Sequence, residues 1–337
     1  MKKKYLILIL ICCTLLTGCF NKKNNALKEI EKKYDNLKSY SLSGDLEIVN
    51  NDDTYNYDVK VIYQKKDKFY VSLKNRNNNH EQIILKNMDG VYVITPSLNK
   101  SFKFQSDWPY NNSQVYLIQS IIDDIKNDKE RNLVTSDSNY VFTSTVNYPN
   151  NRKLVKQVVM FDKDYNLKSV SVEDENDISS MKMTFKTIDL KPDINNDTFE
   201  LNKLMENSTN GEKNTTEKKE EPTSKLDDII YPLYLPTGTV LANSERISKD
   251  DGERIIMTFE GEKPFLLVEE TASIEEEFSI IPTYGEPYLL IDTVGALTDS
   301  SITWNSNGVE YYLVSDVLSQ TELIDIARSV NVIPVMK

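Results

Sequence analysis

The sequence predicts an α+β protein in which an open, curled antiparallel sheet with covering helices is linked to a second, smaller α+β domain. Three observations predict this class. Over residues 26–202, each of two amphipathic segments precedes a run of alternating strands. A polar stretch over residues 203–228 interrupts the pattern, and residues 229–337 hold further strands and a final helix. Helices that alternate with whole runs of strands favour an antiparallel sheet that curls around them.

The composition excludes several classes of protein. The 337 residues include 19 Tyr and 11 Phe, enough large side chains for a packed core. The net charge of −12 opposes non-specific nucleic-acid binding, so we expect no nucleic-acid partner. There is one His, and all three Cys lie in the first 19 residues, which leaves few groups for metal or nucleophile chemistry. We therefore expect no cofactor, no metal ion and no enzymatic activity.

The first 18 residues predict a lipoprotein signal peptide. Three Lys precede an apolar run over residues 5–16, which is too short to span a bilayer but suits the core of a signal peptide. The run ends in Leu16-Thr17-Gly18-Cys19, which resembles the bacterial lipobox. This resemblance implies cleavage between Gly18 and Cys19 and a diacylglyceryl group, with palmitate-type chains, on Cys19. An ordinary secretory signal with an incidental Cys is the alternative.

A lipid on Cys19 determines where the protein acts. Two acyl chains suffice for stable attachment, whereas one is marginal. We therefore expect residues 19–25 to form a lipid-anchored tether that holds the chain at the extracytoplasmic face of the cell membrane. The abundance of Asn, Lys and Ile is typical of an AT-rich genome and favours a Gram-positive source.

The first domain is expected over residues 26–202. Residues 26–40 predict a helix, and residues 113–127 predict a second one that Ser113 caps and that has a wide apolar face. Strands with one wet face are expected at residues 59–63, 69–73, 82–86, 91–95, 102–104, 140–146, 154–161, 167–173 and 181–190. Turns are expected at residues 87–90 and 96–99.

Residues 162–166 present two alternatives. With Glu173 they match the Asp-x-Asp-x-Asn…Glu skeleton of a calcium loop. However, Leu167 occupies the position that needs Gly, and the residues after it alternate as a strand does. A hairpin turn is the favoured interpretation.

The chain then divides. Residues 203–228 have almost no large apolar side chain after Met205, which predicts a disordered polar linker. From residue 225 onward, seven Lys or Arg face 20 Asp or Glu, so the acidity belongs to the second domain. We expect this acidic domain, residues 229–337, to extend outward on the linker.

The second domain contains fewer clear elements. Strands are expected at residues 240–247, 254–260, 265–270 and 309–314, with turns at 250–252 and 306–308. Ser319 and Glu322 form a capping box that opens a final helix.

Four segments of the first domain carry a resemblance to a known family. They are residues 63–69 (YQKKDKF), 88–96 (MDGVYVITP), 161–167 (FDKDYNL) and 198–201 (TFEL). Their order and spacing over residues 26–201 resemble the LolA-like family of outer-membrane lipoprotein carrier and sorting proteins. The resemblance implies an open β half-barrel whose helices cover an apolar cavity that holds acyl chains.

Two departures separate the chain from a diffusing carrier. Lys66 stands where the carrier has an Arg and Asp67 where it has a Pro, and Cys19 ties the protein to the membrane. The combination resembles the anchored sporulation and germination lipoproteins of Gram-positive spore formers, among which one member supports a spore-cortex amidase. The C-terminal part resembles a domain of unknown function that occurs in Firmicute lipoproteins.

The candidate ligand or partner cavity is placed around the middle strands. Its expected lining is Lys66, Tyr92, Ile94, Phe102, Phe104 and Trp108. Ordinary sheet core is the alternative interpretation of the apolar members. His80 and the acidic run 275–277 are expected to lie at a solvated surface.

The functional prediction is a non-enzymatic binding partner or scaffold in the cell envelope, for example one that supports a cell-wall hydrolase in sporulation or germination. Binding or sorting of lipids or lipoproteins in an apolar half-barrel cavity is the alternative, and an enzyme that uses surface carboxylates is a third. A cavity filled by the protein's own side chains would favour a protein partner, and an open apolar cavity would favour lipid.

Overall fold

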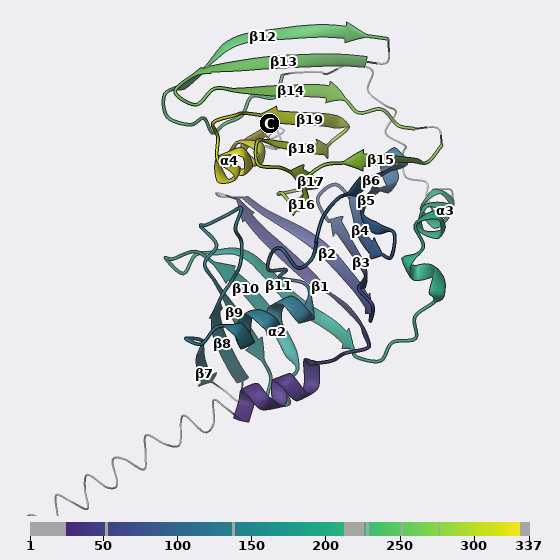
Figure 1. Ribbon diagram of the computed structural model, residues 1–337, viewed down its shortest axis with the longest axis vertical. Helices are drawn as coiled ribbons and strands as arrows, with labels where there is room; N and C mark the ends of the chain where they lie inside the picture. Colours follow the sequence, from purple (N-terminus) through teal and green to yellow (C-terminus); the bar gives the residue numbers. More distant parts are fainter. Residues whose placement is uncertain are drawn as a thin grey trace, which may run out of the picture.

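Two open sheets carry the fold (Figure 1). The computed structural model describes residues 25–50, 53–136, 139–211, 226, 229–250, 252–275 and 277–330. The larger sheet has twelve strands and curls around helices, while the smaller one has seven strands and lies against one end of the first. The predicted α+β class, with an open, curled antiparallel half-barrel, is confirmed.

The larger sheet follows the order β15-β6-β5-β4-β3-β2-β1-β11-β10-β9-β8-β7, and its two ends do not pair with each other. All neighbours are antiparallel except β15 and β6, which run parallel. The strands are β1 (Ser39–Asn50), β2 (Asp53–Gln64), β3 (Lys68–Asn75), β4 (Glu81–Asn87), β5 (Gly90–Thr95), β6 (Lys100–Phe104), β7 (Asn132–Ser136), β8 (Asn139–Thr145), β9 (Lys156–Phe161), β10 (Leu167–Glu173), β11 (Ser179–Asp189) and β15 (Ser279–Thr283).

Helices cover both faces of this sheet. An N-terminal helix (residues 25–34) and α2 (Ile118–Asn127) pack on its concave face, and α3 (Leu201–Gly211) lies outside it (Figure 1). Two 3₁₀ turns, η1 (Pro96–Leu98) and η2 (Asn196–Phe199), complete this part.

The smaller sheet follows the order β12-β13-β14-β19-β18-β17-β16. Its strands are β12 (Thr239–Lys249), β13 (Gly252–Gly261), β14 (Phe265–Thr271), β16 (Glu286–Leu289), β17 (Val294–Leu297), β18 (Ser301–Ser306) and β19 (Val309–Val314). Helix α4 (Gln320–Val330) packs on one face and supplies Leu323, Ile326 and Ala327 to the core. The capping box is confirmed, because Ser319 Oγ accepts the Glu322 N–H at 3.3 Å and Glu322 Oε2 accepts the Ser319 N–H at 3.0 Å.

Every strand expected over residues 26–202 is present, but the two helix boundaries were wrong. The first helix ends at residue 34 rather than 40, because Asn36 adopts a left-handed φ of 58° and β1 follows. The second begins at Ile118 rather than 113, and Ser113 does not cap it. The Ser113 hydroxyl instead accepts the Asn147 N–H at 2.7 Å. Strands β1, β7 and β15–β18 were not predicted.

The expectation that the C-terminal domain extends outward on a linker was wrong. Helix α3 occupies the first nine residues of the expected linker, and residues 212–225, 227 and 228 lie outside the described part. The C-terminal strand β15 joins the edge of the larger sheet. Ile291, Val294 and Ala296 are buried in the core of the half-barrel. Apolar side chains of the second unit therefore bury against the first, which the polar stretch between them did not reveal.

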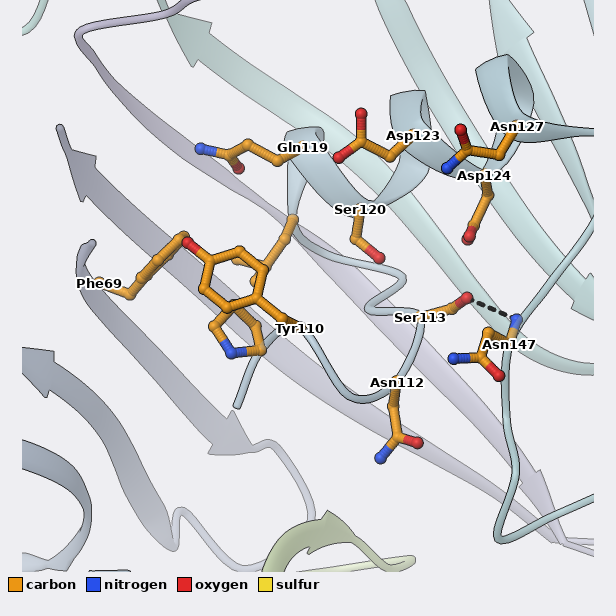
Figure 2. Close-up of a pocket in the computed structure, with 12 residues that line it drawn as sticks. Phe69, Tyr110, Asn112, Ser113, Gln119, Ser120, Asp123, Asp124, Asn127 and Asn147 are labelled. Atoms are coloured by element: carbon orange, nitrogen blue, oxygen red, sulfur yellow. Dashed lines mark hydrogen bonds between the residues drawn. The ribbon is translucent and has the colours of Figure 1, made fainter. Parts of the chain in front are cut away.

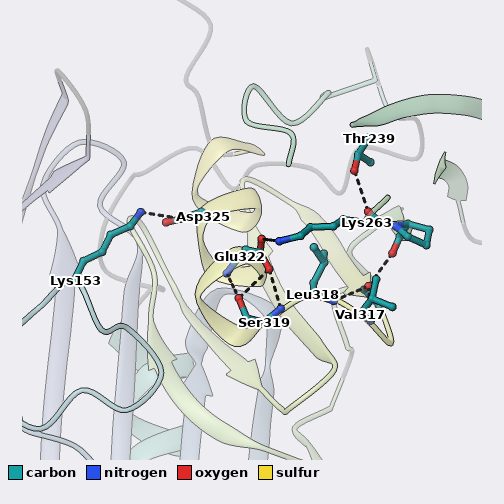
Figure 3. A network of polar contacts seen from close by, with 10 residues as sticks. Lys153, Thr239, Lys263, Val317, Leu318, Ser319, Glu322 and Asp325 are labelled. Carbon is teal, nitrogen blue, oxygen red and sulfur yellow. Dashed lines mark hydrogen bonds and ion pairs between the residues drawn. The ribbon is translucent and has the colours of Figure 1, made fainter. Parts of the chain in front are cut away.

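Hydrogen bonds and ion pairs cross this junction. Tyr57 donates its hydroxyl proton to the Ile291 carbonyl in a buried contact. Gln82 Oε1 accepts from the Thr293 hydroxyl at 3.1 Å and from the Val294 N–H at 2.5 Å. At the surface, Lys153 of the half-barrel reaches Asp325 of α4 at 2.8 Å (Figure 3). The two units thus share one buried, hydrogen-bonded contact.

The predicted signal peptide, cleavage site and lipidated Cys19 lie outside the described residues. Within the described parts of the chain, no helix combines the length and the apolar character needed to cross a membrane.

Candidate functional site

The concave face of the half-barrel is filled by the protein's own side chains. Helix α2 buries Ile118, Ile121, Ile122 and Ile125 against it, and all four are at most 2% exposed. The N-terminal helix and the segment that precedes α2 bury further apolar residues in the same cluster. This interior is therefore a packed core in the part of the chain that the structure describes.

The structure does not bring the six predicted cavity residues together. Phe104 and Trp108 belong to the interior core, and Phe102 packs against it. Tyr92 and Ile94 lie on the opposite face, in a separate cluster under α3.

The sixth residue, Lys66, is exposed in the turn between β2 and β3. The grouping failed because both faces of β5 are apolar: Val91 and Val93 face inward while Tyr92 and Ile94 face outward. Alternation alone does not say which face is the concave one.

A polar cleft of about 270 Å³ lies beside α2, at the rim of the half-barrel. One wall is the face of α2 opposite the buried isoleucines, and the other comes from the segment after β6 and from Phe69. Polar side chains of α2 line it at helical spacing (Figure 2): Gln119, Ser120, Asp123, Asp124 and Asn127.

Hydrogen bonds to the main chain hold the base of the cleft. Ser113 N–H donates to the Asn147 carbonyl at 2.8 Å, and Asn147 N–H donates to Ser113 Oγ at 2.7 Å. Ser120 Oγ accepts the Gln114 N–H at 2.7 Å. In the view of Figure 2, Ser120 and Asp124 point from α2 toward Ser113. These bonds fix the loop before α2 to the helix and to the segment that follows β8.

The second sheet also holds the loop that forms the cleft. Glu286, in β16, accepts from the Ser106 hydroxyl and from Asn111 Nδ2, the latter at 2.7 Å. Trp108, which lies between Ser106 and Asn111 in the sequence, is buried. Its ring meets the Phe69 ring edge-on, with 5.8 Å between the ring centres. The cleft is therefore lined by the first unit, while Glu286 of the second unit holds the loop that forms one wall.

Three buried polar atoms of the cleft have no hydrogen-bond partner among the described residues. They are Asn112 Oδ1, Gln119 Nε2 and Asp124 Oδ2. An unpaired buried polar group normally costs about 1–3 kcal/mol. Such groups need an explanation, and a ligand that pairs with them is one.

Within the described residues, the Asp124 carboxylate of the cleft has no cationic partner. Burial raises the pKa of Asp124 to about 6, against a lowering by the Ser113 hydroxyl, and it also raises the pKa of Asp123. Lys126, on the same helix, bonds both carboxylate oxygens of Asp35 at 3.0 Å and is 4.0 Å from Asp123. The carboxylate of Asp124 is therefore not neutralised by a cation of the α2 face.

The cleft was missed at the sequence level, although its signal was present. The polar residues of α2 recur at positions 119, 120, 123, 124 and 127, one stripe of the expected second helix. Such a stripe is ordinarily a solvated face. Only the loop after β6, whose path the sequence did not predict, turns that face into a cleft.

The alternative metal and histidine sites have structural explanations. The Asp162 carboxylate accepts the N–H groups of Asp164 and Asn166 at 2.9 Å each, which lowers its pKa and makes the hairpin turn that was favoured. Among the described residues, no group of three or more potential ligands is arranged to hold a metal ion. His80 is half-buried in the connection between β3 and β4.

Comparison with known proteins identifies one strong relative. The sporulation protein YdcC of Bacillus subtilis (strain 168) is 34% identical over an alignment of 338 positions, which covers 98% of this chain and 97% of that protein. No family model matches the chain.

Solved structures resemble the chain more distantly. One is the complex of the CwlD amidase from Clostridioides difficile with the GerS lipoprotein, at 19% identity, covering 49% of this chain and 93% of that one, with a TM-score of 0.30. Another is a LolA superfamily protein from Nitrosomonas europaea, at 10% identity, covering 53% and 97%, with a TM-score of 0.30. At these TM-scores the likeness carries no weight for function.

Proposed function

Because this chain belongs to the family of the Bacillus subtilis sporulation protein YdcC, we propose that it is a membrane-anchored lipoprotein that acts in sporulation by binding a protein partner in the cell envelope. The proposal includes a lipid on Cys19, placement at the extracytoplasmic face of the membrane, and a non-enzymatic role. A cell-wall hydrolase is the kind of partner we expect.

The filled interior is the observation that carries the choice of a protein over a lipid. An acyl chain that entered the half-barrel would have to displace α2 and the buried Trp108, which is 1% exposed. Removal of four buried isoleucines from a core costs several kcal/mol. A partner that binds at the rim meets no such penalty.

The limited supply of catalytic groups supports a binding role. The single His, His80, is not among the residues that line the cleft, and no Cys lines it either. The hydroxyls of Ser113 and Ser120 in the cleft therefore have no His beside them to act as a base. Its two neighbouring carboxylates come from consecutive positions of one helix, rather than from opposite walls as glycoside hydrolysis requires.

The test is crosslinking and pull-down of the full chain from the membranes of sporulating cells. We expect an envelope protein such as a cortex hydrolase to be recovered with the native chain. The matched control is Cys19→Ser, which should move the protein out of the membrane fraction. Recovery of envelope lipids alone would contradict the proposal and favour lipid sorting, and an unchanged distribution of Cys19→Ser would contradict the anchor.

A further inference from the structure

The polar cleft beside α2 carries an excess of unpaired acceptors over donors. Two buried oxygens, Asn112 Oδ1 and Asp124 Oδ2, have no partner among the described residues, against one buried donor, Gln119 Nε2. Lys and Arg heads carry donors and no acceptors, so they match two unpaired oxygens. We propose that this cleft receives a basic side chain, an Arg guanidinium or a Lys ammonium, from the protein partner. This inference rests on the proposed function.

Two lysines around the cleft, Lys126 and Lys86, are engaged with other groups of the protein. Lys126 bonds Asp35 through both carboxylate oxygens, and Lys86 donates to the Trp108 carbonyl at 2.7 Å. The Asp124 carboxylate is partly buried and is repelled by its neighbour Asp123. An entering cation would therefore meet the Asp124 carboxylate, which has no cationic partner among the described residues and is largely withdrawn from water, where a charge-assisted hydrogen bond is strong. Asp123, beside it, already has Lys126 at 4.0 Å.

Aromatic rings form the other wall. Phe69 and Tyr110 line the cleft, and Tyr110 is 60% exposed at its mouth. Lys86 Nζ lies 4.7 Å from the centre of the Tyr110 ring, and the Tyr110 hydroxyl donates to Asp67 Oδ1 at 2.6 Å. These contacts hold the ring in place. A flat guanidinium stacks on such a ring, which makes Arg the better fit of the two.

The size of the cleft fits one side chain. Its volume of about 270 Å³ lies below the range of roughly 300–1,000 Å³ that is typical of small-molecule pockets. The unpaired donor Gln119 Nε2 is available to a main-chain carbonyl of the entering segment. Its amide is held in place, because Gln119 Oε1 accepts the Tyr40 hydroxyl proton at 2.7 Å.

The experiment titrates the full chain in detergent with two peptides, acetyl-Gly-Arg-Gly-amide and the same peptide with citrulline, by calorimetry. Citrulline keeps the shape of arginine and removes its charge. We expect the arginine peptide to bind at least tenfold more tightly than the citrulline peptide. Equal affinities, or preferential binding of a neutral disaccharide offered in place of the peptides, would overturn the inference.

Two variants locate the binding. Asp124→Asn keeps the size of the side chain and should weaken binding of the arginine peptide at least tenfold. Glu130 is an exposed carboxylate beyond the end of α2, so Glu130→Gln should leave the affinity unchanged. Unchanged binding by Asp124→Asn would also overturn the inference. The two-peptide comparison on the unaltered chain decides the matter even if Asp124→Asn fails to fold.

The outcome is separable from that of the proposed function. If the pull-down recovers an envelope protein while the arginine peptide does not bind, the partner docks elsewhere and only this inference fails. If the peptide binds but no partner is recovered, the proposed function fails instead.

Discussion

The interior of the half-barrel and the cleft at its rim share helix α2 but differ in chemistry. The inward face of α2 buries isoleucines in a closed apolar core, while the opposite face presents carboxylates and amides with unpaired atoms. The apolar face packs against other residues of the chain, whereas the polar face has buried atoms without a hydrogen-bond partner among the described residues. Stability therefore comes from the interior, and the place to look for binding is the rim.

The largest effect should come from the interior. Trp108→Ala removes a side chain that is 1% exposed and packs edge-on against Phe69, so we expect a loss of about 3–5 kcal/mol in the free energy of unfolding. Urea denaturation followed by circular dichroism measures it. A loss below about 1 kcal/mol would mean that the interior is loosely packed and would reopen the lipid alternative.

In the cleft, a substitution should raise the free energy of unfolding rather than lower it. Burial raises the pKa of Asp124 to about 6, above its value in the unfolded chain, so the folded state binds the extra proton and loses stability as the pH rises from about 4 to 6. Asp124→Asn removes this penalty, which is about 3 kcal/mol at most. We expect the variant to be more stable than the native chain at pH 7.5 and equally stable at pH 4.

The measurement for this second prediction is urea denaturation at both pH values. The groups around Asp124 include Asp123 on the same helix, Ser113 and Asn147 across the cleft, and the buried Tyr148. Asp123 is the other carboxylate among them, and burial raises its pKa as well. A variant less stable than the native chain at pH 7.5 would show that Asp124 stabilises the fold rather than serving a ligand.

The junction between the two units should show an intermediate effect. Tyr57→Phe leaves the buried Ile291 carbonyl without its donor, which costs about 1–2 kcal/mol. Hydrogen exchange should show faster opening at residues 290–296 while the N-terminal helix keeps its protection. Uniform loosening of the whole chain, or none, would contradict the account of a specific buried contact.

The smallest effect is expected at the surface of the same junction. Lys153 is 64% exposed in its pair with Asp325 (Figure 3), and exposed pairs contribute about 0–1 kcal/mol. Lys153→Met should change the free energy of unfolding by less than about 0.5 kcal/mol. A change as large as that of Tyr57→Phe would mean that the main contact between the two units lies at the surface.

The sequence predicted the half-barrel strands because one-sided burial imposes a period of two, as in β8–β11. It failed where both faces are covered: the faces of β5 are indistinguishable by pattern, so Tyr92 and Ile94 were grouped with Phe104 and Trp108. It failed again for β15 and the buried Ile291, since docking between units depends on long-range contacts that no local pattern encodes. The cleft required the path of the loop after β6, which only tertiary structure provides.

The most direct test of partner binding at the rim is site-specific photocrosslinking of the full chain in sporulating cells. A photoreactive phenylalanine would replace Tyr110 at the cleft mouth in one strain and Tyr312 on β19, which is 42% exposed, in another. We predict a protein adduct at position 110 that Asp124→Asn reduces, and no such adduct at position 312. A protein adduct at position 312 alone, or only lipid adducts at position 110, would contradict binding at the cleft.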